Sequence, residues 1–322
     1  MEPARKNTPG RGGGAVTTYA LVMVLGSAVV HAGWNLATKK AEGGTAYVFL
    51  MAAGSALIWF PLFLWLLVTG KAAEPGTSVL STVAAVAISG AIHTAYFMSL
   101  QAGYGCGDLS LVYPLARGTG PLISTFAAIL LYGERPSALA MAGALLIGGG
   151  AFFLAGRDGQ EGEPCDAEDP DRPARAQHRA IAYGLLTGFL IAGYTLWDKF
   201  ALSRLGLNPM FLGPATNFAR AAGMAPFFLL SANRRAEVQN AMRTQWKPAL
   251  IVSLSSPFSY MLILTALAVS PVSYVAPARE ISILLGTLAG TRLLEEGNPS
   301  SRRRRLWASA AMAAGVAALA IG

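Results

Sequence analysis

The chain has 322 residues, of which 53% are hydrophobic and only 13% are charged, and its net charge is +8. Soluble domains carry about 25% charged residues, so this composition excludes an ordinary soluble protein. The basic residues fall in short loops and at helix ends, as in "RRRR" at 302–305, which predicts membrane orientation and lipid contact and argues against nucleic-acid binding.

Apolar runs long enough to cross a hydrocarbon core of about 30 Å recur along the chain. They predict an all-α membrane protein with ten transmembrane helices, near 17–38, 46–69, 78–100, 108–132, 138–156, 180–202, 207–231, 247–269, 272–294 and 304–321. The first run is too long for the apolar part of a signal peptide, so we expect it to be retained. Cys106 and Cys165 form no metal or disulfide motif.

A stretch at 157–179, rich in Asp, Glu, Pro and Gly, separates the fifth run from the sixth. Such a composition cannot bury a core and predicts a solvated acidic linker. The predicted organisation is therefore an N-terminal tail at 1–16, five helices at 17–156, the linker, and five helices at 180–322.

The two halves contain matching segments. "AGWNLATK" (32–39) matches "AGYTLWDK" (192–199) at an offset of 160. "YPLARGTG" around Arg117 matches "APAREIS" around Arg279, and Glu134 and Glu296 each follow their arginine by 17 residues. Five helices is an odd number, so the second copy enters from the opposite side of the membrane. Two inverted five-helix repeats predict a substrate site in a central cavity between the halves, with alternating access.

The segments "HAGWNLATKK", "YPLARGTGPLISTFAAILLYGERPS" and "PVSYVAPAREISILLGTLAGTRLLEEG" carry a family resemblance. From about residue 17 to 321, the chain resembles the ten-helix members of the drug/metabolite transporter superfamily, the EamA-type permeases. The resemblance implies that helices 1–4 and 6–9 surround a central cavity and that helices 5 and 10 are peripheral. It implies transport of a small metabolite, but the family's substrates range from amino acids and amines to sugar phosphates, so it names none.

Two repeat-related polar faces are the first candidates for a substrate site. We predict that they line opposite walls of the cavity, because lipid does not tolerate a polar face. Their residues are His31, Trp34, Asn35 and Lys39 on the first helix, and Tyr194, Thr195, Asp198 and Lys199 on the sixth.

These faces have other interpretations. Asn35 and Thr195 are of a type that hydrogen-bonds between membrane helices. Trp rings such as Trp34, and Tyr rings, also anchor helices at the membrane interface. Lysines near helix ends, as Lys39 and Lys199 are, also extend into the headgroups.

Arg117 and Arg279 lie well inside the apolar runs, where an arginine is costly unless it is paired or hydrated. Pro114 and Pro277 just upstream predict broken helices, and a broken helix beside an arginine is a candidate anion or carboxylate site. Inversion predicts that the two arginines lie nearer opposite membrane faces, each closing its own gate. The alternative is a structural role in capping carbonyls between the fourth and ninth helices.

The other candidate wall residues are His93, Tyr96, Tyr113, Tyr260 and Glu280. Glu280 has no counterpart in the first repeat, where Gly118 stands, and Asp198 likewise stands against Thr38. An unmatched carboxylate in a membrane is a candidate proton carrier or partner for a cationic substrate group. Arg220 is interpreted as a structural or snorkelling residue.

The predicted function is secondary active transport of a small polar metabolite, coupled to a proton, another ion or a substrate gradient. The excess of basic wall residues favours an anionic or zwitterionic substrate, while the aromatic residues leave an organic cation, a quaternary amine or a drug open. No GxxxxGK[ST], HExxH or GxSxG motif occurs, so we predict no enzyme activity, no metal site and no cofactor. A non-transporting receptor, a lipid-handling bundle and an intramembrane enzyme are the rival classes.

We expect a monomer or homodimer, surrounded by membrane lipids, in the plasma (inner) membrane of a bacterium. The Lys and Arg distribution places both termini outside.

Overall fold

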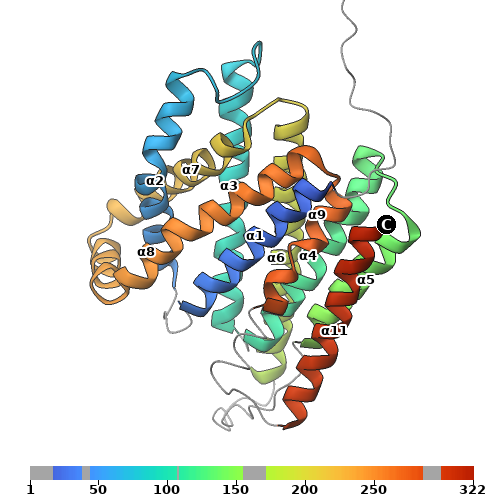
Figure 1. Ribbon diagram of the computed structural model, residues 1–322. Helices are drawn as coiled ribbons and strands as arrows, with labels where there is room; N and C mark the ends of the chain where they lie inside the picture. The colour runs from blue at the N-terminus through green and yellow to red at the C-terminus, as the bar shows by residue number, and fades with distance from the viewer. Residues whose placement is uncertain (1–16, 38–43, 107–108, 155–171, 286–298) are drawn as a thin grey trace, which may run out of the picture.

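The structure of the protein is a computed structural model, and it describes residues 17–37, 44–106, 109–154, 172–285 and 299–322. Within these ranges the chain is helical apart from short connections (Figure 1). The helices are α1 (Thr18–Ala37), α2 (Thr45–Val68), α3 (Val79–Cys106), α4 (Leu109–Tyr132), α5 (Ala138–Leu154), α6 (Arg172–Ser203), α7 (Pro209–Leu229), α8 (Ala232–Val269), α9 (Val272–Ala278) and α11 (Pro299–Ile321).

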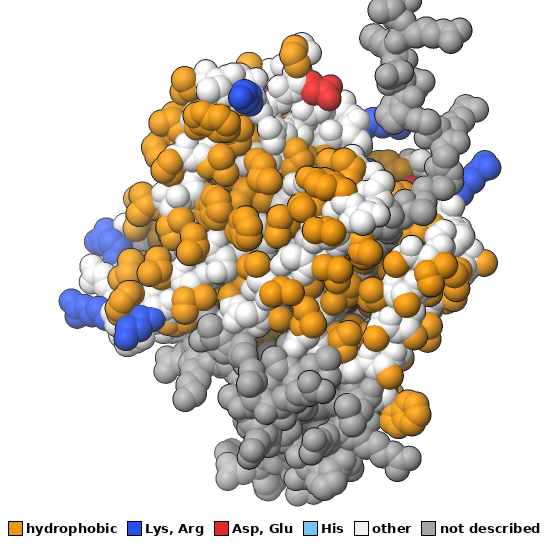
Figure 2. Space-filling model, viewed as in Figure 1, with side chains coloured by type: hydrophobic (Ala, Val, Ile, Leu, Met, Phe, Trp, Pro, Cys, Tyr) orange, Lys and Arg blue, Asp and Glu red, His pale blue; other side chains and the backbone are white. Residues whose placement is uncertain are grey.

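Five segments of the described chain are long and apolar enough to cross a membrane. They are Thr45–Val68, Val79–Tyr104, Leu115–Tyr132, Gln177–Ser203 and Ala232–Val269. Large apolar side chains such as Leu57, Val68 and Leu130 are more than 70% exposed to the surroundings of the chain. Figure 2 shows such side chains spread over the visible face, with Lys and Arg mostly near its edges. This outward-facing apolar surface confirms an all-helical, membrane-embedded protein.

Three helices, α6, α8 and α11, begin several residues before the apolar run predicted for them, and α6 and α8 extend furthest. α6 begins at Arg172, inside the range predicted as linker, because a helix continues past its apolar part where polar residues such as Arg and Gln favour helix. α8 begins at Ala232 and contains a break at Gln245, whose φ is −126°. Pro248 explains this break, since a proline ring clashes with the carbonyl four residues earlier. The apolar part after the break coincides with the predicted span at 247–269.

The predicted ninth span is broken in the middle. α9 ends at Ala278, Arg279 and Glu280 form a turn, and helix resumes at 281–285. The N–H of Glu280 donates to the carbonyl of Pro277 (3.0 Å), and that of Ile283 to Glu280 (2.9 Å), which are the tighter bonds of a turn. The break predicted from Pro277 is therefore confirmed, whereas α4 runs unbroken through Pro114.

Helices from the two halves of the sequence pack against one another through the whole bundle (Figure 1). The pairs are α1 with α8, α2 with α7 and α8, α3 with α6 and α7, α4 with α6 and α9, and α5 with α11. α5 and α11 lie side by side along one edge, where a Cβ on Gly143 would come within 2.6 Å of the carbonyl oxygen of Gly315.

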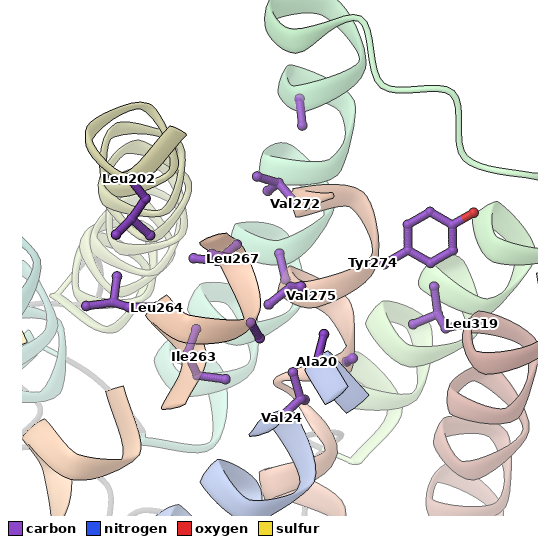
Figure 3. Close-up of a cluster of buried hydrophobic side chains, with 14 of the residues drawn as sticks. Ala20, Val24, Leu202, Ile263, Leu264, Leu267, Val272, Tyr274, Val275 and Leu319 are labelled. Atoms are coloured by element: carbon purple, nitrogen blue, oxygen red, sulfur yellow. The ribbon is translucent and has the colours of Figure 1, made fainter. Parts of the chain in front are cut away.

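The main apolar core lies where α8 meets α9 (Figure 3). Side chains from seven other helices join it, among them Ala20 and Val24 of α1, Ala128 of α4, Leu202 of α6 and Leu319 of α11. Glu134, at the end of α4, accepts bonds from the N–H groups of Val272 and Ser273, both 2.8 Å, and so caps α9. Core packing and the Glu134 cap together hold the broken helix in position.

The connections α2–α3 and α6–α7 are joined by a short backbone ladder. Ala73 and Leu207 form an antiparallel bridge, and the N–H of Glu74 donates to Gly206 (2.9 Å). The N–H of Asn208 donates to Ala72 (2.9 Å), and the same residue caps α7. One loop layer therefore ties the first half of the sequence to the second.

Candidate functional site

An ionic centre lies where α4 meets the broken helix. Glu280 is 0% exposed, and its Oε2 lies 3.0 Å from Nε of Arg117. Its Oε1 lies 3.6 Å from Nε of Arg279. A buried charge persists only when opposite charges surround it, so one carboxylate here holds two guanidinium groups.

The helix break builds this centre. Ser282, just after the turn, donates its hydroxyl to the carbonyl of Arg279 (3.1 Å) and accepts a bond from Nη2 of Arg117 (3.2 Å). An unbroken helix would satisfy that carbonyl internally and turn Ser282 elsewhere. Pro277 therefore contributes to the site through the backbone, although its own side chain is apolar.

An aromatic cluster adjoins the ionic centre, and His93 of α3 lies in it. His93 stacks on Tyr194 of α6 with ring centroids 4.1 Å apart, and meets Tyr260 of α8 edge-on at 5.2 Å. Tyr96 meets Tyr194 edge-on at 5.6 Å, and the guanidinium of Arg279 lies 5.6 Å from the Tyr194 ring. Aromatic faces attract cations at such distances, so Tyr194 links the aromatic cluster to the charged one.

A second buried carboxyl group lies at the edge of the aromatic cluster. Asp198 is 0% exposed and accepts a short hydrogen bond from the hydroxyl of Tyr260. None of the described Lys, Arg or His side chains forms an ion pair with it. The Ser89 side chain also hydrogen-bonds Asp198, and its hydroxyl lies 3.4 Å from Nδ1 of His93 and 3.1 Å from the hydroxyl of Thr216 on α7. The carboxyl group of Asp198 is thus buried without a charge partner, which sets it apart from Glu280.

The first helix contributes at least two side chains near this region. His31 and Trp34 meet edge-on with centroids 4.8 Å apart. His31 lies within electrostatic reach of both Arg117 and Arg279. The side chains of Asn35, Lys39 and Tyr113, and all of Glu296, lie outside the described residues.

Two predicted residues use their polar groups elsewhere. The ammonium group of Lys199 donates to the carbonyls of Leu267 (2.6 Å) and Ser270 (3.0 Å), at the C-terminal end of α8. The hydroxyl of Thr195 bonds the carbonyl of Ile191 in its own helix (2.7 Å). Lys199 therefore serves as a helix cap, as cationic side chains often do there.

One expectation about the arginines is wrong, and for Arg220 one of two alternatives is excluded. Arg117 and Arg279 do not lie at separate gates, because both approach the single carboxylate of Glu280. Arg220 does not snorkel either, because it is only 7% exposed, and its Nη1 donates to Asn217 (2.9 Å). Its guanidinium lies 4.2 Å from the ring of Phe97. An arginine within the apolar run "FARAAGMAPFF", with an asparagine three residues before it, was the signal for this group.

The positions that differ between the two halves have physical explanations. Gly118, which stands where Glu280 stands in the second half, packs so closely that a Cβ would come within 2.6 Å of Phe152. Ile191, the counterpart of His31, is fully buried, and a Cβ on Gly120 would come within 2.7 Å of it. At Gly118 the close packing of α4 on α5 leaves no room for a glutamate like Glu280. At Ile191 the close packing of α4 on α6 leaves no room for a histidine like His31.

The described chain gathers no group of three or more His, Cys, Asp or Glu side chains that would hold a metal ion. No protein-family model and no curated protein matches the sequence. The fold, however, is shared with solved structures. One crystal structure superposes with a TM-score of 0.68, covering 94% of this chain and 96% of that chain at 14% identity.

The fold and the buried polar site together define a class: an all-helical membrane protein with several apolar membrane-crossing helices and an ionisable cluster inside the bundle. Charged groups inside such a bundle are costly, and they mark substrate or ion pathways when they occur.

Proposed function

We propose that this protein is a secondary active transporter of the EamA type, within the drug/metabolite transporter superfamily. It carries a small anionic or zwitterionic metabolite across the plasma membrane of a bacterium. Ten helices form two inverted five-helix repeats, and alternating access exposes the buried cluster first to one side and then to the other. The observation that carries the proposal is a charged and aromatic centre built jointly by both halves of the chain.

The pattern of helix packing supports the repeats. If α1–α5 correspond to α6–α9 and α11 in order, then α2·α7, α4·α9 and α5·α11 are contacts between equivalent helices. The contacts α1·α8 and α3·α6 then form an equivalent pair, as do α2·α8 and α3·α7. A two-fold relation between the halves accounts for all of these contacts together.

Two hydrogen bonds support the same relation at the level of residues. The hydroxyls of Ser27 and Ser259 lie 2.8 Å apart between α1 and α8. Thr187 donates to Ser99 (3.0 Å) between α6 and α3. Thr187 is 160 residues after Ser27, and Ser259 is 160 after Ser99, which is the offset of the matching "AG" segments. Hydroxyl pairs of this kind hold membrane helices together.

The surroundings of the two carboxyl groups separate their roles. Glu280 lies between Arg117 and Arg279, and these two fixed ion pairs give it a structural role. Asp198 is fully buried, and its described partners are two neutral hydroxyl groups, those of Tyr260 and Ser89. Proton uptake there would remove an uncompensated buried charge, so Asp198 is the better proton carrier of the two.

A second candidate is transport of an organic cation. His93, Tyr96, Tyr194 and Tyr260 surround the region of Asp198, and aromatic faces beside a carboxylate are suited to a quaternary amine. The buried charges favour the anion, because three arginines face two carboxyl groups among the buried residues.

Purified protein reconstituted into liposomes tests the proposal. Counterflow of labelled carboxylates, phosphonates, amino acids and quaternary amines is measured under proton, sodium and potassium gradients. The proposal predicts saturable flux of at least one anionic or zwitterionic compound. A folded protein that moves none of the panel contradicts transport, and flux of quaternary amines alone selects the cation.

A further inference from the structure

Arg220 is a buried arginine that neither the ionic centre nor the packing of the bundle accounts for. It is 7% exposed, in the middle of α7. Its Nη1 donates a hydrogen bond to the neutral amide oxygen of Asn217 (2.9 Å), and its buried Nε has no hydrogen-bond partner among the described residues. No described Asp or Glu forms an ion pair with it. An unpaired guanidinium in such a place is strongly destabilising unless an anion reaches it.

The guanidinium is held in a defined orientation. It lies 4.2 Å from the ring of Phe97 on α3, and Asn217 itself is fixed because its Nδ2 donates to the carbonyl of Gly213 (3.0 Å). The guanidinium stacks on Phe97 and uses Nη1 for the bond to Asn217, so its other N–H groups are available to bind a ligand. A planar fork fixed in this way is suited to a carboxylate or phosphonate group.

Arg220 belongs to the same region as the cluster described above. Phe97 meets Tyr96 edge-on with centroids 4.7 Å apart, and Tyr96 in turn meets Tyr194. His93 lies within electrostatic reach of both Arg220 and Arg279. The aromatic cluster therefore lies near two guanidinium groups, those of Arg279 and Arg220. Arg279 is paired with Glu280, whereas no described carboxylate pairs with Arg220.

Charge balance points to the sign of the ligand. The buried guanidinium and carboxyl groups of the described chain are those of Arg117, Arg220, Arg279, Asp198 and Glu280. Three guanidinium groups and two carboxyl groups leave one positive charge, and two when Asp198 is protonated. A single anionic group bound at Arg220 removes the excess.

We infer that Arg220 is the residue that binds the anionic group of the substrate, with a carboxylate or phosphonate as the group it takes. The inference rests on the proposed transport function and deepens it. Arg279 and the rings between the two arginines then contact the body of the same molecule. In the conformation described, Arg220 is almost fully buried, so the anion reaches it when the two halves separate.

Thermal unfolding of the purified protein in detergent tests this site. The probes are sodium benzoate and sodium phenylphosphonate, at constant ionic strength, with benzamide as the uncharged counterpart of benzoate. We expect both anions, but not benzamide, to raise the apparent melting temperature in a saturable way. Arg220→Met is expected to reduce that rise at least fivefold, and Arg220→Lys, which keeps the charge without the fork, to retain part of it.

A structural role for Arg220 predicts a different result. If the arginine only packs the bundle, Arg220→Met lowers the melting temperature of the protein without anion. If Arg220 is instead an uncompensated charge that binds an anionic ligand, Arg220→Met leaves the melting temperature of the anion-free protein unchanged or raises it. The matched control is Arg234→Met, because Arg234 also stacks on a phenylalanine, at 3.3 Å from Phe227, but lies at the start of α8.

The possible outcomes separate this inference from transport itself. No rise with either anion, or an equal rise in the parent and in Arg220→Met, overturns the inference, even if liposomes show flux. Saturable binding that depends on Arg220, with no flux of any compound by folded protein, supports the anion site and rejects the transporter. An equal loss of binding in Arg234→Met would also overturn the inference, since it would show a general effect of removing an arginine.

Discussion

At the scale of single residues, some of the predicted site residues meet in one cluster and others have their partners elsewhere. His93, Tyr194, Tyr260, Arg279 and Glu280 are in contact within one cluster. Their residue types explain why the sequence predicted them, since ionisable and aromatic groups inside apolar runs are rare unless they serve a site. Lys199 was also predicted, but its partners are backbone carbonyls, and no sequence pattern distinguishes a lysine that caps a helix from one that lines a site.

Partners across helices were not predictable from the sequence. The meeting of Arg117, Arg279 and Glu280 depends on how α4 packs against a broken helix, and no local pattern encodes that geometry. For the same reason the sequence left Arg220 open between a structural and a snorkelling role, because its isolation from carboxylates is visible only in three dimensions. Neutral partners such as Ser282 cannot be predicted at all, because nothing in the sequence distinguishes a serine that bonds an arginine from any other serine.

Glu280→Gln tests the ionic centre. The substitution leaves two buried guanidinium groups without a counter-charge, which costs about 3–5 kcal/mol. We expect a clear fall in the apparent melting temperature in detergent. Glu74→Gln, at an exposed carboxylate in the α2–α3 connection, serves as the control and should change little. Equal melting temperatures for Glu280→Gln and the parent would show that the buried pair does not hold α4 to the broken helix.

Asp198→Asn tests proton coupling. The amide keeps the size of the side chain and still accepts the bond from Tyr260, but it cannot release or take up a proton. We expect uptake driven by a proton gradient to fall at least tenfold, while exchange of labelled for unlabelled substrate continues. Gradient-driven uptake at the parent rate in Asp198→Asn would remove Asp198 from the coupling step.

At the scale of elements, the apolar pattern located the helices well but not all of their ends. The pattern records where lipid begins and ends, and α6 and α8 continue beyond it as polar helix. The interruption of the ninth span was signalled by Pro277, yet Pro114 in α4 produced none. A proline permits a break, and the surrounding packing decides whether it occurs.

The contact between α5 and α11 supplies a prediction at this scale. Gly143→Ala would place a Cβ 2.6 Å from the carbonyl oxygen of Gly315, so the helices must separate, at a cost of about 1–3 kcal/mol. Gly149 of the same helix has open space at its Cβ position. Gly149→Ala should therefore leave the melting temperature unchanged or raise it, because alanine favours helix by about 0.5–1 kcal/mol over glycine. Equal effects of the two substitutions would contradict close packing at Gly143.

At the scale of the whole molecule, helices from both halves of the sequence meet around a buried cluster. The backbone ladder between the α2–α3 and α6–α7 connections ties these halves at one end of the bundle. If the halves move to expose the cluster, a covalent bond across the ladder should stop them. Paired residues in an antiparallel bridge lie about 4.5–5.5 Å apart between Cα atoms, which is within the range that a disulfide spans.

The most direct measurement is flux through liposomes that contain the double variant Ala73→Cys and Leu207→Cys, with Cys106 and Cys165 replaced by alanine. We predict saturable flux of an anionic metabolite in the reduced protein, its loss when the disulfide forms, and its return after reduction. Each single-cysteine variant should keep its flux under oxidation. Folded protein without flux in the reduced state, or unchanged flux after complete cross-linking, would contradict transport by movement of the two halves.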